Sequence, residues 1–113
     1  MLMVNFEKRD SIDIVTFTIN KIDALISDEI REKIVRLFEN PNARVVIDLK
    51  GVEYIDSSGF GCFLSSFKAA RNNYGILKFS NAEPHINILF ETLNLHTVFE
   101  IFNDTESCIK SFR

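Results

Sequence analysis

Residues 43–81 read ARVVIDLKGVEYIDSSGFGCFLSSFKAARNNYGILKFSN, and this stretch decides the fold. The apolar run at 45–47 has no polar alternation, which is typical of a strand buried on both faces in a parallel sheet. The segment 57–71 follows with an apolar stripe at helical spacing, which predicts a helix. Residues 75–81 then form another apolar segment and close a β–α–β crossover. The stripe consists of Phe60, Phe63, Leu64 and Phe67.

The segments before this stretch predict a hairpin and a helix. Residues 3–7 and 15–20 alternate between apolar and other side chains, so each is expected to form a short strand. Ser27 is the expected N-cap of the next helix, because its hydroxyl can accept a backbone hydrogen bond. The sequence NPN at 40–42 ends that helix. The helix is expected to bury Ile30, Ile34, Leu37 and Phe38.

The segments after it predict a helix, a strand and a final helix. Pro84 stands where a first-turn proline belongs, and residues 98–103 read as the last strand. Asp104 or Thr105 is expected to cap a closing helix. The third helix is expected to bury Ile86, Leu89, Phe90 and Leu93.

The resulting order is β-β-α-β-α-β-α-β-α, over residues 1–113 as a single domain. This order predicts an α/β fold with a single mixed, mainly parallel β-sheet and helices packed on it. Right-handed crossovers place the starts of the helices along one rim, at the carboxyl ends of the strands. The sequence DSSG at 56–59 is therefore expected at that rim.

Composition excludes several classes of function. The chain has 113 residues, of which 46% are apolar and 26% charged, and its net charge is −3. These values indicate a folded globular protein, and no basic block of the kind that nucleic-acid binding requires is present. No segment reads as a signal peptide or a membrane span, so direct membrane insertion is not expected. A cytoplasmic location is expected instead. Cys62 and Cys108 lack metal-ligand spacing and are expected to be buried, reduced thiols.

The DSSG sequence has three possible roles. Asp56 or Ser57 could cap the second helix while Gly59 allows close packing, which is a purely structural role. Ser57 or Ser58 could be a nucleophile, but the G-x-S-x-G pattern is absent and neither His85 nor His96 has an evident reason to approach.

The third role is a phosphorylation switch. A phosphoserine in the first turn of a helix is favoured by the helix dipole by roughly 0.3–1 kcal/mol. A partner docked over the rim would instead meet about −1.5 to −2 new charges beside Asp56. The fold would be spared and the complex lost.

The residues VVIDLKGVEYIDSSG (45–59) and NAEPHINILFETLNLHTVFEIF (81–102) resemble the STAS domain, in particular the anti-sigma-factor antagonists. The resemblance extends over nearly the whole chain. It implies a non-enzymatic regulator that binds a serine-kinase anti-sigma factor when dephosphorylated. The kinase would then phosphorylate it and be released, and a phosphatase would reset it. No cofactor or metal site is implied.

The resemblance also implies roles for individual residues. Ser58 would be the phosphorylated residue, and Asp23, Asp56 and Ser57 would contact the partner. Independently of the resemblance, the start of the second helix is expected to present Ser58, Gly59 and Phe60 to the partner, although a helical aromatic such as Phe60 is more often part of the core. The alternative is a constitutive STAS interaction subunit of a transport or signalling assembly, without phosphorylation.

The sequence departs from the family pattern at a few turns. Asn20 and Asn94 stand where the family often has glycine, and both are expected to keep left-handed backbone angles. Tyr74 replaces a glycine that is common before Gly75.

Overall fold

The computed structural model describes residues 3–113, and its centre is a five-stranded sheet in the order β1-β2-β4-β6-β7. The first two strands are antiparallel, and the remaining neighbours are parallel. The strands are β1 (Val4–Arg9), β2 (Ile12–Phe17), β4 (Arg44–Asp48), β6 (Ile76–Ser80) and β7 (Ile101–Phe102). A separate parallel pair consists of β3 (Lys21–Ile22) and β5 (Tyr54–Ile55). The predicted mixed, mainly parallel α/β fold is confirmed.

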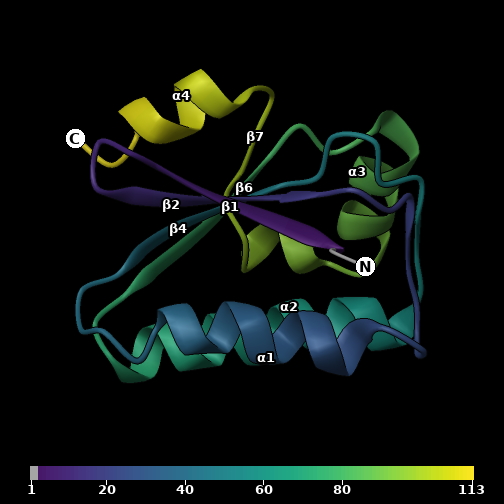
Figure 1. Ribbon diagram of the computed structural model, residues 1–113. Coiled ribbons are helices and arrows are strands. Elements are labelled where there is room, and N and C mark those ends of the chain that lie inside the picture. Colours follow the sequence, from purple (N-terminus) through teal and green to yellow (C-terminus); the bar gives the residue numbers. More distant parts are fainter. Residues whose placement is uncertain (1–2) are drawn as a thin grey trace.

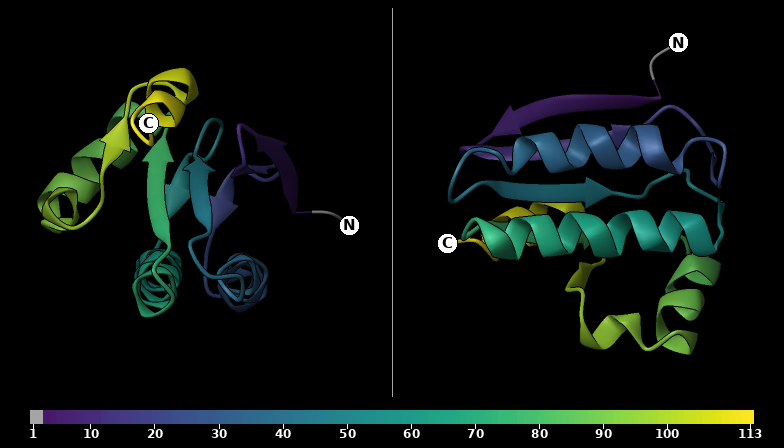
Figure 2. Two further views of the ribbon diagram at one scale, coloured as in Figure 1. Left: turned by 90° about the vertical axis from the view of Figure 1, so that its left-hand side faces the viewer. Right: turned by 90° about the horizontal axis from the view of Figure 1, so that it is seen from below.

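The helices lie on both sides of the sheet. They are α1 (Ser27–Leu37), α2 (Ser57–Asn72), α3 (Pro84–Thr92) and α4 (Thr105–Lys110), with a 3₁₀ turn at Leu95–Thr97. Figure 1 shows the sheet nearly edge-on, with α1 and α2 beneath it and α4 above it. Figure 2 shows α1 and α2 running side by side along the sheet. The predicted order of elements holds, apart from the two short strands β3 and β5, which sequence reasoning missed.

The central strand β4 is buried on both faces, as its unbroken apolar run predicted. Val45 and Ile47 join the larger core against the layer of α1 and α2, whereas Val46 joins a smaller cluster that includes Cys108 and Ile109 of α4. The larger core contains edge-to-face phenylalanine pairs, such as Phe63 against Phe79 with ring centroids 5.1 Å apart. This geometry adds attraction to the burial of the rings themselves.

Two predictions near the N-terminus are wrong in detail. The second strand begins at Ile12, because Asp10 and Ser11 both have positive φ and form a two-residue hairpin turn. The helix α1 has Ile26 at its N-cap position and no side-chain cap, since Ser27 is itself the first helical residue and is buried. The Ser27 amide bonds to the Asp23 backbone carbonyl instead.

Later segments also differ from their predictions. The last strand, predicted over residues 98–103, has only two residues, because Val98 is the C-cap of the 3₁₀ turn and the chain bends at Phe99 before β7 begins. Asn94 has the expected left-handed angle, with φ at 58°, and Tyr74 has φ at 60°, but Asn20 does not have a positive φ. The predicted apolar faces of the second and third helices included three leucines that are exposed in the structure, namely Leu64, Leu89 and Leu93.

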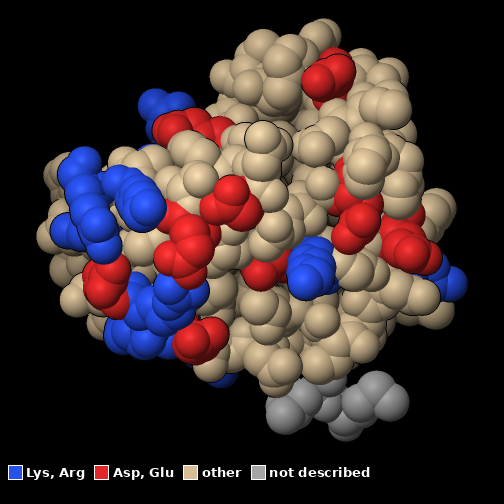
Figure 3. Space-filling view, turned by 90° about the horizontal axis from the view of Figure 1, so that it is seen from above, with Lys and Arg blue, Asp and Glu red and all other residues tan. Residues whose placement is uncertain are grey.

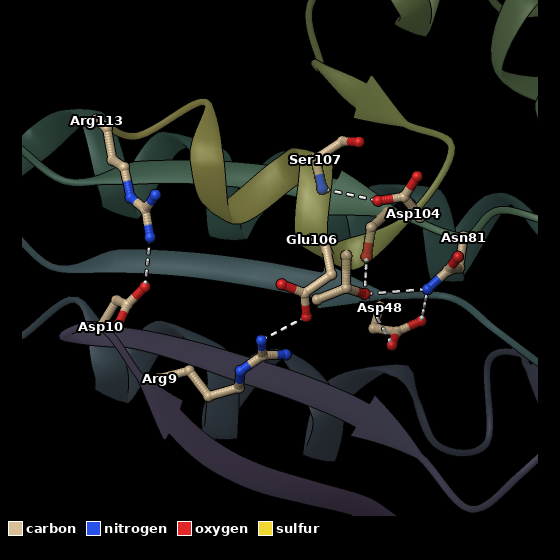
Figure 4. Close-up of polar contacts among 10 residues, drawn as sticks. Arg9, Asp10, Asp48, Asn81, Asp104, Glu106, Ser107 and Arg113 are labelled. Atoms are coloured by element: carbon tan, nitrogen blue, oxygen red, sulfur yellow. Dashed lines mark hydrogen bonds and ion pairs between the residues drawn. The ribbon is translucent and has the colours of Figure 1, made fainter.

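Polar contacts join α4 to the sheet. Asp48 at the end of β4 accepts hydrogen bonds from Asn81 Nδ2 at 3.1 Å and from Thr105 Oγ1 at 3.2 Å (Figure 4). Ion pairs link Arg9 to Glu106 and Arg113 to Asp10, so the turn between β1 and β2 is joined to α4 and to the C-terminal residue. On this face of the molecule, basic and acidic side chains lie intermixed (Figure 3). No helix within residues 3–113 is long and apolar enough to cross a membrane.

Candidate functional site

The short strands β3 and β5 bring two acidic residues together at one edge of the molecule. Ile22 pairs with Ile55, and each strand is followed directly by an aspartate, Asp23 and Asp56. Neighbouring strands lie about 5 Å apart, so the two aspartates are close neighbours. The Asp56 amide also donates to the Ile22 carbonyl at 3.2 Å. The structure thus places Asp23 beside DSSG, although 33 positions separate the two aspartates in the chain.

Asp56 is the N-cap of α2. Its Oδ1 accepts a hydrogen bond from the Gly59 amide at 3.0 Å, which satisfies one of the free donors in the first helical turn. Ser57 and Ser58 are the first two helical residues; Ser57 is exposed and Ser58 partly exposed. Asp23 is fixed in a similar way, because its Oδ1 accepts from the Leu25 amide at 3.0 Å.

Gly59 and Phe60 attach this first turn to the core. A Cβ atom at Gly59 would lie 2.6 Å from Ile55 Cγ2 and 2.8 Å from the Ile22 carbonyl oxygen, so only glycine fits without displacement. Phe60 is 5% exposed and packs edge-to-face on Phe90, with ring centroids 5.3 Å apart. These two residues therefore position the serines from beneath, and the ring of Phe60 belongs to the core.

A groove of about 670 Å³ extends this edge past Asp23. Leu25, at 93% exposure, is the most exposed of the large apolar side chains described, and it borders the groove. Phe17, Ile19, Ile26 and Gly51 are further lining residues. Sequence reasoning missed this groove. A signal was present in Leu25, an apolar residue just before α1 that lies outside the stripe the helix buries.

The chemistry available at this edge is carboxylate and hydroxyl chemistry. His85 Nε2 donates to the backbone carbonyl of Glu53. His96 lies in the 3₁₀ turn, where it lines a different groove together with Glu91. In the described part of the chain, no cluster of histidine, cysteine, aspartate and glutamate side chains is suited to a metal ion.

Both cysteines are free and buried, as predicted. Burial raises the pKa of the Cys62 thiol to about 12, and it raises the pKa of Cys108 to about 12 as well. The reactive form of cysteine is the thiolate, so both side chains are chemically inert near neutral pH.

Comparison with known proteins supplies the family. Residues 3–108 match the STAS domain family. The anti-sigma-B factor antagonist of Bacillus subtilis (strain 168) is 32% identical over 103 residues, which cover 91% of this chain and 94% of that protein.

Solved structures agree with this assignment. An anti-sigma-factor antagonist (STAS) domain protein from Planctomyces limnophilus has a TM-score of 0.87 at 13% identity, covering 96% of each chain. The anti-sigma factor antagonist SpoIIAA from Bacillus is known in an unphosphorylated and a phosphorylated form. The unphosphorylated form has a TM-score of 0.79 at 19% identity and covers 97% of this chain and 96% of SpoIIAA. A STAS domain match over nearly the whole chain, a relative above 30% identity and the shared fold lead to one conclusion: this chain belongs to the STAS domain family, among the anti-sigma factor antagonists.

Proposed function

We propose that this protein is the switchable component of a cytoplasmic partner-switching circuit that controls a sigma factor. In its dephosphorylated form it binds a serine-kinase anti-sigma factor and thereby frees the sigma factor. The kinase uses ATP to phosphorylate Ser58, the complex dissociates, and a phosphatase restores the hydroxyl. The chain itself has no catalytic role in this scheme.

The observation that carries the proposal is the position of Ser58. It is partly exposed in the first turn of α2, two residues after the cap Asp56, which lies next to Asp23. A kinase can reach such a hydroxyl, and a docked partner would cover it. The relatives support this role, since one of them is named as an anti-sigma-B factor antagonist and SpoIIAA has a phosphorylated form.

The magnitudes favour loss of the complex over loss of the fold. A phosphate at a helix N-terminus is stabilised by roughly 0.3–1 kcal/mol through the helix dipole and the free amide groups. A partner that covers the site must bury about −1.5 to −2 additional charges next to two aspartates. Leaving such a charge unpaired costs about 3–5 kcal/mol, which corresponds to a loss of affinity of roughly a hundred- to several thousandfold.

The groove beside Asp23 supplies the apolar part of the same contact. Leu25 is almost fully exposed at its border, and a partner side chain that entered the groove would cover it. Apolar anchors surrounded by polar residues are typical of protein interfaces. We therefore place the partner over Leu25, Asp23 and Ser58 together.

The first test is phosphorylation of the purified chain by its cognate serine-kinase anti-sigma factor with ATP, followed by intact-mass measurement. One phosphate is expected on the wild-type chain and on Ser57→Ala, and none on Ser58→Ala. A modified Ser58→Ala protein would contradict the assignment of the site.

The second test is calorimetric measurement of affinity for the same partner. Ser58→Asp is expected to weaken binding by a hundredfold or more. Ser65→Asp adds the same charge to an exposed position further along α2 and serves as the control. Equal affinity of the two variants would refute the charge-repulsion mechanism. If Ser58→Ala also keeps every signal-dependent response in cells, the alternative of a constitutive interaction subunit is favoured.

A further inference from the structure

The strand β1 forms the border of the sheet and leaves one edge of its backbone without a partner strand among residues 3–113. It pairs only with β2. The Thr18 amide donates to the Met3 carbonyl, and hydrogen-bonded pairs alternate along an antiparallel ladder. Val4, Phe6 and Lys8 therefore direct their backbone N–H and C=O groups away from β2, toward the open side.

A groove lies directly beside this edge. Phe6 is 47% exposed and shares a face of β1 with Val4, which belongs to the core beneath the sheet. Together with Leu37 of α1, Phe6 lines a groove of about 310 Å³. In Figure 2, β1 borders the sheet on the same side as α1. Open backbone groups beside a groove for alternate side chains are the two features that strand addition uses.

The charges of the groove are basic. Lys33 and Arg36 line it, neither forms an ion pair within the described residues, and no acidic side chain of that part of the chain contributes to the lining. Lys8 projects from β1 on the same face as Phe6, since residues two apart share a face. Its side chain is 67% exposed, although it lies 3.5 Å from Asp13.

The same charges disfavour a second copy of this chain. A paired β1 would bring its own Lys8 toward Lys33 and Arg36, and like charges at close range repel. An acidic strand is attracted by all three cations. The occupant favoured by charge is therefore an extended segment of a different protein.

We propose that the outer edge of β1 and the groove beside α1 form a docking site for an extended, acidic segment of a partner protein. The segment adds antiparallel or parallel to β1, inserts an apolar side chain against Phe6 and Leu37, and places carboxylates near Lys33 and Arg36. Figure 1 shows that β1 and α1 both run away from the edge at which α2 begins. The groove lies toward the C-terminal end of α1, so this site is separate from Ser58.

The test uses nine-residue peptides with leucine at the centre, glutamate two positions before and after it, and threonine elsewhere. Binding to the ¹⁵N-labelled full chain is followed by NMR. Shifts are expected at the amides of Val4, Phe6 and Lys8 and along the second half of α1. Affinity should fall with rising salt, and a peptide with lysine in place of glutamate should not bind.

Four variants separate strand addition from nonspecific attraction. Lys8→Pro removes an outward N–H without breaking the ladder to β2, whereas Lys8→Ala removes only the charge. Proline is expected to weaken binding roughly tenfold more than alanine does. Lys33→Glu should weaken binding of the glutamate peptide, and Ser58→Asp should leave it unchanged. If no peptide binds to the wild-type chain, or if Lys8→Pro and Lys8→Ala bind the glutamate peptide equally well, β1 does not accept an added strand and the proposal is wrong.

Discussion

Replacing Gly59 by alanine tests how the first turn of α2 is held in place. The added Cβ would lie 2.8 Å from the Ile22 carbonyl oxygen, which is 0.6 Å short of the 3.4 Å at which ordinary contact begins. The obstacle is backbone, so it cannot rotate away as a flexible side chain could. Either α2 must move off the pair β3–β5, or that pair must separate.

Gly61 provides the matched control. It lies two residues further along the same helix, and an added Cβ there would meet nothing within 4 Å. Both substitutions gain about 0.5–1 kcal/mol from the better helix propensity of alanine. The difference in unfolding free energy between the two variants therefore isolates the steric cost, which is about 1–3 kcal/mol for overpacking of this kind.

Urea denaturation followed by circular dichroism is the suitable assay, because the chain contains no tryptophan. A small single domain is expected to unfold in one cooperative step, so midpoints and slopes yield free energies directly. Gly61→Ala should be more stable than the wild type and Gly59→Ala less stable. Equal stability of the two variants would show that the close approach of Gly59 to Ile22 does not constrain the helix.

Three further outcomes are expected. Tyr74→Gly should stabilise the protein by up to about 1 kcal/mol in urea denaturation, because Tyr74 has φ at 60°, a backbone angle that is strained for any residue with a Cβ atom. Tyr74→Ala is the control, since alanine keeps the Cβ atom and therefore the strain. The Ser107 amide lowers the pKa of Asp104 below its ordinary 3.8, so the stability from this carboxylate is present above pH 4 and lost as pH falls through the lower folded value. Asp104→Asn should therefore be less stable than wild type near pH 7 and equally stable at acidic pH, measured by thermal melts. Cys62 and Cys108 should resist Ellman's reagent at pH 8 in the native protein and both react after unfolding, since burial raises each pKa to about 12.

The close packing beneath the serines has a consequence for the proposed switch. No space remains for a side chain between Gly59 and Ile22, and Phe60 packs on Phe90, so the turn that carries Ser58 is closely packed from beneath. A phosphate there is expected to alter the surface charge with little movement of the backbone. Phosphorylation would therefore act by repelling the partner and not by changing the conformation of the domain.

Local patterns in the sequence were sufficient for most of the fold. The unbroken apolar run of β4 indicated burial on both faces, and the cap Asp56 with Gly59 indicated the start of α2. These features depend on residues close together in the chain, where periodicity and capping chemistry are informative. The same reasoning placed the two serines in the first turn of that helix.

Only the tertiary structure decided which distant residues meet. The strands β3 and β5 have two residues each, too few for any periodic signal, yet their pairing brings Asp23 to Asp56. The exposure of Leu25 and the burial of Phe60 likewise depend on which neighbours cover them. Contacts between segments far apart in the chain arise from packing of the whole molecule, and residue spacing alone does not contain that information.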